Sequence, residues 1–275
     1  MTHFGKIGII GGGHMGSSLV GGLLQQQVKA NDLLVADNNP STLKLLNDKW
    51  GVSTFNSTHE IVSKVDILVL AVKPQQFKAL LQDINKQFDA TKTLVISIAA
   101  GITTTQIIKW LANPHCELVR AMPNTPALVG AGITGLYATP NVGASKKQQA
   151  QDLLGAVGET VWIKDESLMD VVTALSGSGP AYFYYLMETL INSATTLGLS
   201  HEVASKLTLQ TAVGSAKMAQ LSKEEIATLR AQVTSKGGTT EAGIAALKDG
   251  KLQDLITKTL QAATKRGKAL SQEYD

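Results

Sequence analysis

The feature that most constrains this chain is a glycine-rich loop at residues 11–16, with the sequence GGGHMG. It follows a short apolar run (KIGII, residues 6–10) typical of a buried strand, and a helical pattern from about Met15 to Gln26 comes after it. A G-x-G-x-x-G sequence between a strand and a helix is the fingerprint of a dinucleotide-binding βαβ unit. Gly11 permits the tight turn, Gly13 lets a pyrophosphate approach the backbone, and Gly16 lets the helix pack close to the strand.

The first 160 residues alternate apolar runs with helical patterns. Strands that are apolar on both faces and separated by helices indicate a mostly parallel sheet covered on both sides. We therefore expect a Rossmann-like α/β domain over residues 1–163. Its strands are predicted at 6–10, 33–36, 66–72, 93–97 and 117–121, with edge strands at 134–137 and 160–163 and helices at 15–26 and 42–49.

The second half, residues 164–275, reads as an all-α domain with helices at 180–197, 202–221, 241–247 and 252–270. Four consecutive aromatic residues, from Tyr182 to Tyr185, face all sides of the first of these helices. One domain surface does not bury a whole turn of aromatic side chains. The helix is therefore either a central core helix or a helix buried between subunits, and we expect the second, a homodimer through the helical domain.

Composition excludes several classes of protein. Apolar residues make up 44% and charged residues 17%, an ordinary globular balance. The net charge of +3 comes without a dense basic stripe, so no nucleic-acid partner is expected. No apolar run of about 18 residues predicts a membrane span. A single cysteine, Cys116, requires no oxidising compartment, and we expect a buried thiol, a cytoplasmic location and no metal site.

Ligands of open α/β sheets bind beyond the carboxyl ends of the strands. Three strand ends carry candidate residues: Ala71, Val72, Lys73 and Pro74; Ile98, Ala99 and Ala100; and Asn124, held between two prolines. Asp37 ends the second strand, 21 residues after Gly16, where an acid commonly holds ribose hydroxyls and disfavours a 2′-phosphate. No arginine follows nearby, so the sequence leaves both NADH and NADPH open.

The segment Ser235-Lys236-Gly237-Gly238-Thr239-Thr240 joins two helical stretches and opens the second. Backbone N–H groups at a helix start can bind a carboxylate, and the glycines allow close approach. The hydroxyls of Ser235 and Thr240 can add hydrogen bonds. A plain capped turn between helices is the alternative interpretation.

Taken together, these motifs resemble the pyrroline-5-carboxylate reductase family. The resemblance rests on GIIGGGHMG at 8–16, AVKP at 71–74, SIAAGIT at 97–103, RAMPNTPALVGAG at 120–132, LSGSGPAY at 175–182 and VTSKGGTTEAGIAAL at 233–247. It implies a reductase that uses NADPH or NADH, and a dimer interlocked through the helical domains that assembles further into rings in many members. It implies cofactor contacts at Ile10, Gly11, Gly12, Gly13, His14, Met15, Gly16, Asp37, Asn56, Ala71–Pro74, Ile98–Ala100 and Asn124, and substrate contacts at Ser235, Gly237, Gly238, Thr239 and Thr240.

The reaction implied is hydride transfer to the C=N carbon of 1-pyrroline-5-carboxylate, which gives L-proline. A protonated imine is already electrophilic, so positioning contributes most of the barrier reduction, and Thr240 is the expected catalytic residue through a hydrogen bond to the ring nitrogen. One alternative is a β-hydroxyacid dehydrogenase, whose Asn-x-x-x-Lys is absent because Thr196 lies four residues after Asn192. A non-catalytic dinucleotide sensor is the other.

Overall fold

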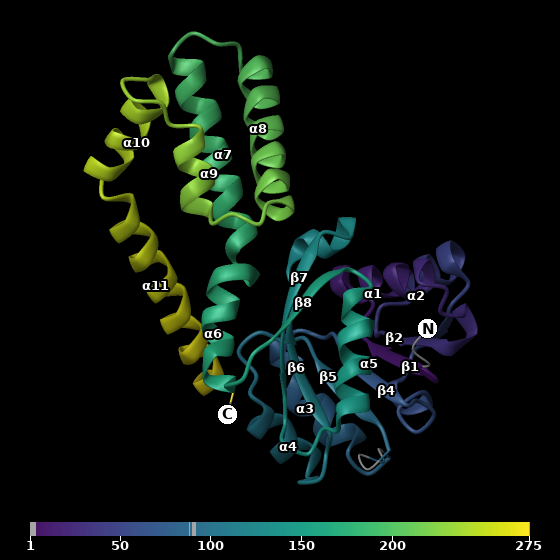
Figure 1. Ribbon diagram of the computed structural model, residues 1–275. Helices are drawn as coiled ribbons and strands as arrows, with labels where there is room; N and C mark the ends of the chain where they lie inside the picture. The colour runs from purple at the N-terminus through teal and green to yellow at the C-terminus, as the bar shows by residue number, and fades with distance from the viewer. Residues whose placement is uncertain (1–3, 88, 90–91, 275) are drawn as a thin grey trace. The chain divides into compact units, whose positions relative to one another are not determined.

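The computed structural model describes residues 4–87, 89 and 92–274. The described residues form two units: the first comprises those up to Ser178 together with residues 262–274, and the second is Gly179–Gln261. The functional division expected at residues 163 and 164 stays a prediction. Because the relative placement of the units is not determined, each is described by itself (Figure 1).

The first unit is built on a sheet with the order β3-β2-β1-β4-β5-β6-β7-β8. All pairs from β3 to β6 are parallel, β7 is antiparallel to β6, and β8 is parallel to β7. The sheet confirms the expected α/β class. The strands are β1 (Ile7–Ile10), β2 (Leu33–Ala36), β3 (Ser53–Phe55), β4 (Ile67–Leu70), β5 (Leu94–Ser97), β6 (Leu118–Met122), β7 (Gly132–Ala138) and β8 (Gly158–Trp162).

Two details of the expected sheet were wrong. β3 was missed because it has only three residues, all half-buried, and therefore lacks the continuous apolar run of its neighbours. The strand predicted at 134–137 is not an edge strand: β7 lies between β6 and β8, and the edges of the sheet are β3 and β8.

Helices cover both faces of the sheet and bury two separate clusters of side chains. On one face, Leu19 and Leu23 of α1 and Leu153 of α5 pack against alternate residues of the strands. On the other, Phe77 of α3 and Trp110 of α4 pack against the remaining residues. This explains why β1, β2, β4 and β5 are buried along their whole length. The helices are α1 (His14–Gln25), α2 (Pro40–Trp50), α3 (Pro74–Ile84), α4 (Thr104–Leu111), α5 (Ala144–Gly155) and α6 (Met169–Val172), with a π-helical turn at Thr173–Gly177.

The second unit is helical throughout. It contains α7 (Gly179–Thr196), α8 (His201–Leu221), α9 (Ile226–Gln232), α10 (Thr239–Asp249) and the first part of α11 (Leu252–Glu273), whose remainder belongs to the first unit. Phe183, Tyr184 and Tyr185 of α7 are each more than 60% exposed in the single chain, so α7 is not the core helix of one subunit. No helix in the described part of the chain is both long and apolar enough to span a bilayer.

Candidate functional site

The glycine-rich loop forms a tight crossing between β1 and α1. Gly11 has φ +104°, and a Cβ atom there would lie 2.5 Å from the carbonyl oxygen of Ala71. A Cβ atom at Gly16 would lie 2.0 Å from the carbonyl oxygen of Gly11, so a larger residue would push α1 away from the loop. At Gly13 no described atom lies within 4 Å of such a Cβ, which leaves open space at the helix N-terminus. These are the three conditions that a bound pyrophosphate requires.

Asp37 links the end of β2 to this loop. Its Oδ2 accepts a hydrogen bond of 2.7 Å from the backbone N–H of Gly12, and its Oδ1 accepts one of 2.8 Å from the N–H of Asn39. The Asp37 N–H donates to the carbonyl of Phe55, the last residue of β3. The carboxylate therefore has a fixed position at the carboxyl end of the sheet and leaves further lone pairs for a ligand.

A cavity of about 600 Å³ opens at the carboxyl ends of β1, β2 and β4. This is where open α/β sheets bind dinucleotides, at the point where strand order reverses about β1. Its lining includes eight of the residues predicted to bind the cofactor: Ile10, Gly11, Gly13, Asp37, Asn56, Ala71, Val72 and Lys73.

Sequence reasoning missed the rest of this lining. Most of the missed residues follow β2, follow the unpredicted β3, or lie on α3 beyond its first turn: Ala36, Asn38, Asn39, Thr42, Ser57, Thr58, His59, Gln76, Leu80 and Asp83. The imidazole of His59 contacts Asp83 Oδ2 through Nε2 at 2.9 Å and Gln87 through Nδ1 at 2.7 Å, which ties the segment after β3 to α3. A prediction of β3 would have placed this segment beside the cavity.

The other predicted cofactor residues lie outside the described lining of this cavity: Gly12, His14, Met15, Gly16, Pro74, Ile98, Ala99, Ala100 and Asn124. Several have evident structural contacts. Both ends of the Asn124 amide are occupied, because its Nδ2 donates to the Ser176 carbonyl and its Oδ1 accepts from the Ile133 N–H. Pro74 is the first residue of α3, and Ile98 donates its N–H to Leu70. Their cofactor contacts stay predictions.

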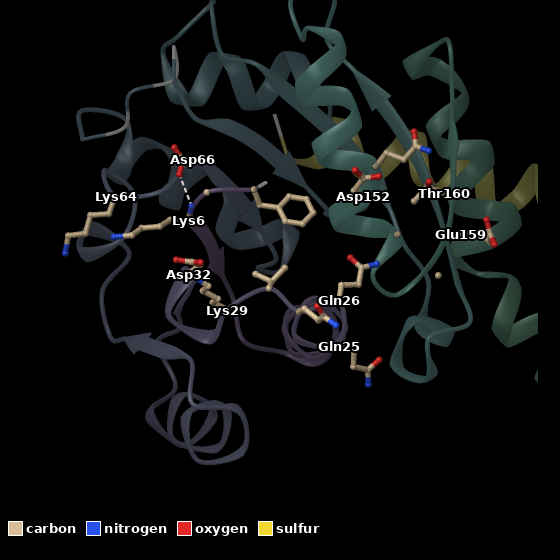
Figure 2. A pocket seen from close by; sticks show the side chains of 17 residues that line it. Lys6, Gln25, Gln26, Lys29, Asp32, Lys64, Asp66, Asp152, Glu159 and Thr160 are labelled. Carbon is tan, nitrogen blue, oxygen red and sulfur yellow. Dashed lines mark hydrogen bonds between the residues drawn. The ribbon is translucent and has the colours of Figure 1, made fainter. Parts of the chain in front are cut away.

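A larger cavity, of about 1230 Å³, lies elsewhere in the first unit (Figure 2). Lys6, Asp32 and Asp66, which line it, immediately precede β1, β2 and β4, so it lies at the amino ends of these strands. The Asp66 carboxylate accepts a hydrogen bond from the Lys6 backbone N–H (Figure 2). Ligands of such sheets bind at the carboxyl ends of the strands, so the dinucleotide is not expected in this cavity.

In the second unit, residues 235–240 form a tight turn that leads into α10. The Gly238 N–H donates to the Ser235 carbonyl at 3.0 Å, and the Gly237 N–H donates to Glu241 Oε2 at 2.7 Å. Gly237 has φ +74°, a left-handed conformation that favours glycine. A Cβ atom at Gly238 would lie 2.6 Å from Ser235 Oγ, so a larger residue there would displace this hydroxyl. The N–H groups of Thr239 and Thr240, in the first turn of α10, have no acceptor within the helix.

Cys116 is the one cysteine of the chain and is fully buried. Burial, together with the neighbouring Glu117 carboxylate, raises the pKa of its thiol to about 12. The thiol therefore stays protonated at neutral pH, which excludes Cys116 as a nucleophile.

Comparison with known proteins shows the family to which this chain belongs. A family model described as pyrroline-5-carboxylate reductase dimerisation matches residues 166–270, and one described as NADP oxidoreductase coenzyme F420-dependent matches residues 6–101. A pyrroline-5-carboxylate reductase of Pseudomonas aeruginosa is 42% identical to this chain, and the match covers 98% of this chain and 97% of the relative. The chain belongs to the pyrroline-5-carboxylate reductase family.

Solved structures of pyrroline-5-carboxylate reductases are similar to this chain over nearly its whole length. The enzyme from Coxiella burnetii is 41% identical, with a TM-score of 0.94, and the match covers 98% of this chain and 99% of that one. The Plasmodium falciparum enzyme, solved with NADP bound, is 31% identical with a TM-score of 0.85 over the same shares. Membership of the pyrroline-5-carboxylate reductase family confirms the expected fold class and an NAD(P)H-dependent oxidoreductase, and the dimerisation model indicates a homo-oligomer. It favours neither the dehydrogenase nor the non-catalytic sensor.

Proposed function

We propose that this chain reduces 1-pyrroline-5-carboxylate to L-proline with NAD(P)H, and that residues 235–240 bind the carboxylate of the substrate. The observation that carries the second part is the first turn of α10. The backbone N–H groups of Thr239 and Thr240 lie at the positive end of the helix dipole, beside two glycines that keep the approach open.

The donors available to a carboxylate follow from the hydrogen bonds of this turn. The N–H groups of Gly237 and Gly238 are already used to hold the turn. Thr239 and Thr240 therefore provide the main-chain donors, and the side-chain hydroxyl of Ser235 lies on the same turn. The glycines contribute by their backbone shape, and Glu241 contributes by fixing Gly237 in its left-handed conformation.

Reduced nicotinamide, when bound, supplies the hydride. The residues of the chain bind and orient: the loop from Gly11 to Gly16 receives the pyrophosphate, and the first turn of α10 holds the substrate by its carboxylate. Thr240 Oγ1 hydrogen-bonds the ring nitrogen and keeps the imine proton in place. The reaction requires no strong side-chain acid, because a protonated imine is already electrophilic.

The proposal extends to assembly and location. The exposed aromatic residues of α7 support a dimer through the helical unit, and we propose that such dimers assemble further into a ring. The free, buried thiol of Cys116 is compatible with a reducing compartment, and we propose a cytoplasmic location.

Thr240→Ala tests the catalytic assignment. We expect kcat/KM for 1-pyrroline-5-carboxylate to fall about 10- to 100-fold, because a hydrogen bond to a charged group contributes about 1.5–3 kcal/mol. Thr240→Ser keeps the hydroxyl and should restore most of the activity. Both variants should bind the reduced dinucleotide like the wild-type protein. Unchanged turnover in Thr240→Ala would remove Thr240 from the mechanism.

A further inference from the structure

The carboxylate of Asp37 is held in one position at the edge of the dinucleotide cavity. Its two oxygens accept hydrogen bonds from the N–H groups of Gly12 and Asn39, which belong to two different segments. A side chain anchored at both oxygens does not rotate away from an incoming ligand. The carboxylate therefore keeps a fixed place in the cavity beyond the end of β2.

The basic residues described near this cavity do not face the Asp37 carboxylate. Lys73 lines the cavity but follows β4, and β1 lies between β4 and β2 in the sheet. His59 lines it too, but its Nε2 contacts the carboxylate of Asp83. Lys44, the first basic residue after Asp37 in the sequence, forms an ion pair with Asp48 on the exposed face of α2.

We propose that Asp37 makes this chain select NADH over NADPH, an inference that rests on the proposed dinucleotide site. The free hydroxyls of the adenosine ribose of NADH donate hydrogen bonds to the remaining lone pairs of the carboxylate. A 2′-phosphate carries about −1.5 to −2 charges at neutral pH, brings acceptors in place of a donor, and meets a carboxylate that does not move aside. Repulsion between like charges then weakens NADPH binding specifically.

Binding of the two reduced dinucleotides, measured by calorimetry on the full-length protein without any imine, tests this proposal. We expect the dissociation constant of NADPH to exceed that of NADH at least 10-fold. Asp37→Asn removes the charge and keeps one oxygen to accept from a backbone N–H, so the ratio of the two constants should approach one. Asp37→Ser should shift it in the same direction, and thermal unfolding of both variants reports whether the loop remains intact.

Asp254→Asn is the matched control, since it removes the same charge from an exposed residue of α11 outside the cavity lining and leaves the Lys44–Asp48 ion pair intact. Its ratio should equal that of the wild-type protein. NADPH binding as tight as NADH binding, or a folded Asp37→Asn variant with an unchanged ratio, would overturn the proposal. Because no substrate is present, failure to reduce 1-pyrroline-5-carboxylate would count against the proposed function alone.

Discussion

At the scale of single residues, the three glycines of the G-x-G-x-x-G motif have different reasons to be glycine. Gly11 adopts a left-handed backbone, Gly16 has no room for a Cβ atom, and Gly13 has both room and an ordinary φ of −63°. The protein itself therefore needs Gly11 and Gly16, whereas Gly13 leaves space that only a ligand would use.

This difference predicts opposite outcomes for two similar substitutions. Gly13→Ala should change the free energy of unfolding by less than about 1 kcal/mol, because the new methyl group meets nothing in the free protein. Its affinity for reduced dinucleotide should nevertheless fall at least 10-fold.

Gly16→Ala should lose dinucleotide affinity and also about 1–3 kcal/mol of stability, because its methyl group overlaps the loop. Denaturant unfolding and dinucleotide titration of both variants provide the measurements. If Gly13→Ala binds dinucleotide normally, the space beside Gly13 is not the pyrophosphate site.

The roles of the three glycines could be predicted from the sequence because they depend on local backbone shape, which the motif fixes within six residues. The hydrogen-bond partners of Asp37 and Asn124 could not be predicted. Asp37 accepts a hydrogen bond from the Gly12 N–H, and Asn124 accepts one from the Ile133 N–H and donates one to the Ser176 carbonyl. These bonds join segments that only the folded sheet brings together. The position of His59 in the cavity lining could not be predicted either, because it follows β3, which the sequence pattern did not indicate.

At the scale of elements, a buried ion-pair network fastens the short helices after β8 to the sheet. Arg120 of β6 is 4% exposed at its side chain and contacts the carboxylates of Glu166 and Asp170 at 3.1 and 3.5 Å. Glu166 also accepts hydrogen bonds from the backbone N–H and the hydroxyl of Thr104, at the start of α4. One arginine thus connects β6, α4, α6 and the turn that precedes α6.

Arg120→Ala should lower the free energy of unfolding by about 3 kcal/mol, since it leaves two carboxylates that are only 20% and 13% exposed without their cation. Arg266→Ala breaks an ion pair with Glu273 that is more than half exposed, and should hardly change stability. Urea unfolding of the two variants gives the comparison. Equal effects would show that the Arg120 network contributes no more than a surface pair.

The sequence pattern predicted most of the strands but not this ion-pair network. β1, β2, β4 and β5 were predicted nearly to the residue because strands buried on both faces have continuous apolar sequences. β6 was also predicted, one residue early, but its sequence does not indicate that Arg120 is buried, because that burial depends on acids 46 and 50 residues later in the chain. α9 was missed because seven residues are too few for a periodic pattern to stand out.

At the scale of the whole molecule, the helical unit exposes more apolar side chains than a monomer ordinarily does. Phe183, Tyr184 and Tyr185 of α7 are accompanied by exposed leucines on α7 and α8, including Leu186, Leu190, Leu207 and Leu209. A second copy of the chain is the partner that the dimerisation model implies.

Phe183→Asp should raise the dissociation constant of the dimer about 100-fold or more. Each buried phenylalanine contributes about 1.5–3 kcal/mol, and a two-fold interface loses two of them. Leu45→Asp is the control: Leu45 is 61% exposed, comparable to Phe183 at 67%, but lies on α2 of the dinucleotide unit. Sedimentation equilibrium should show a weakened dimer for the first variant only. An unchanged dimer in Phe183→Asp would place the interface away from this end of α7.

The return of α11 to the first unit determines how the chain can be divided by protein engineering. In the sequence, the second unit is an insertion within the first, because residues 262–274 follow it and belong to the first unit. There, Leu270 packs over Gly101 and the Ser271 carbonyl accepts a hydrogen bond from Gln106 of α4. A fragment truncated at Ser178 would lose these contacts. An isolated nucleotide-binding domain should instead join Ser178 to Ala262 through a designed linker, so that the C-terminal helix is retained.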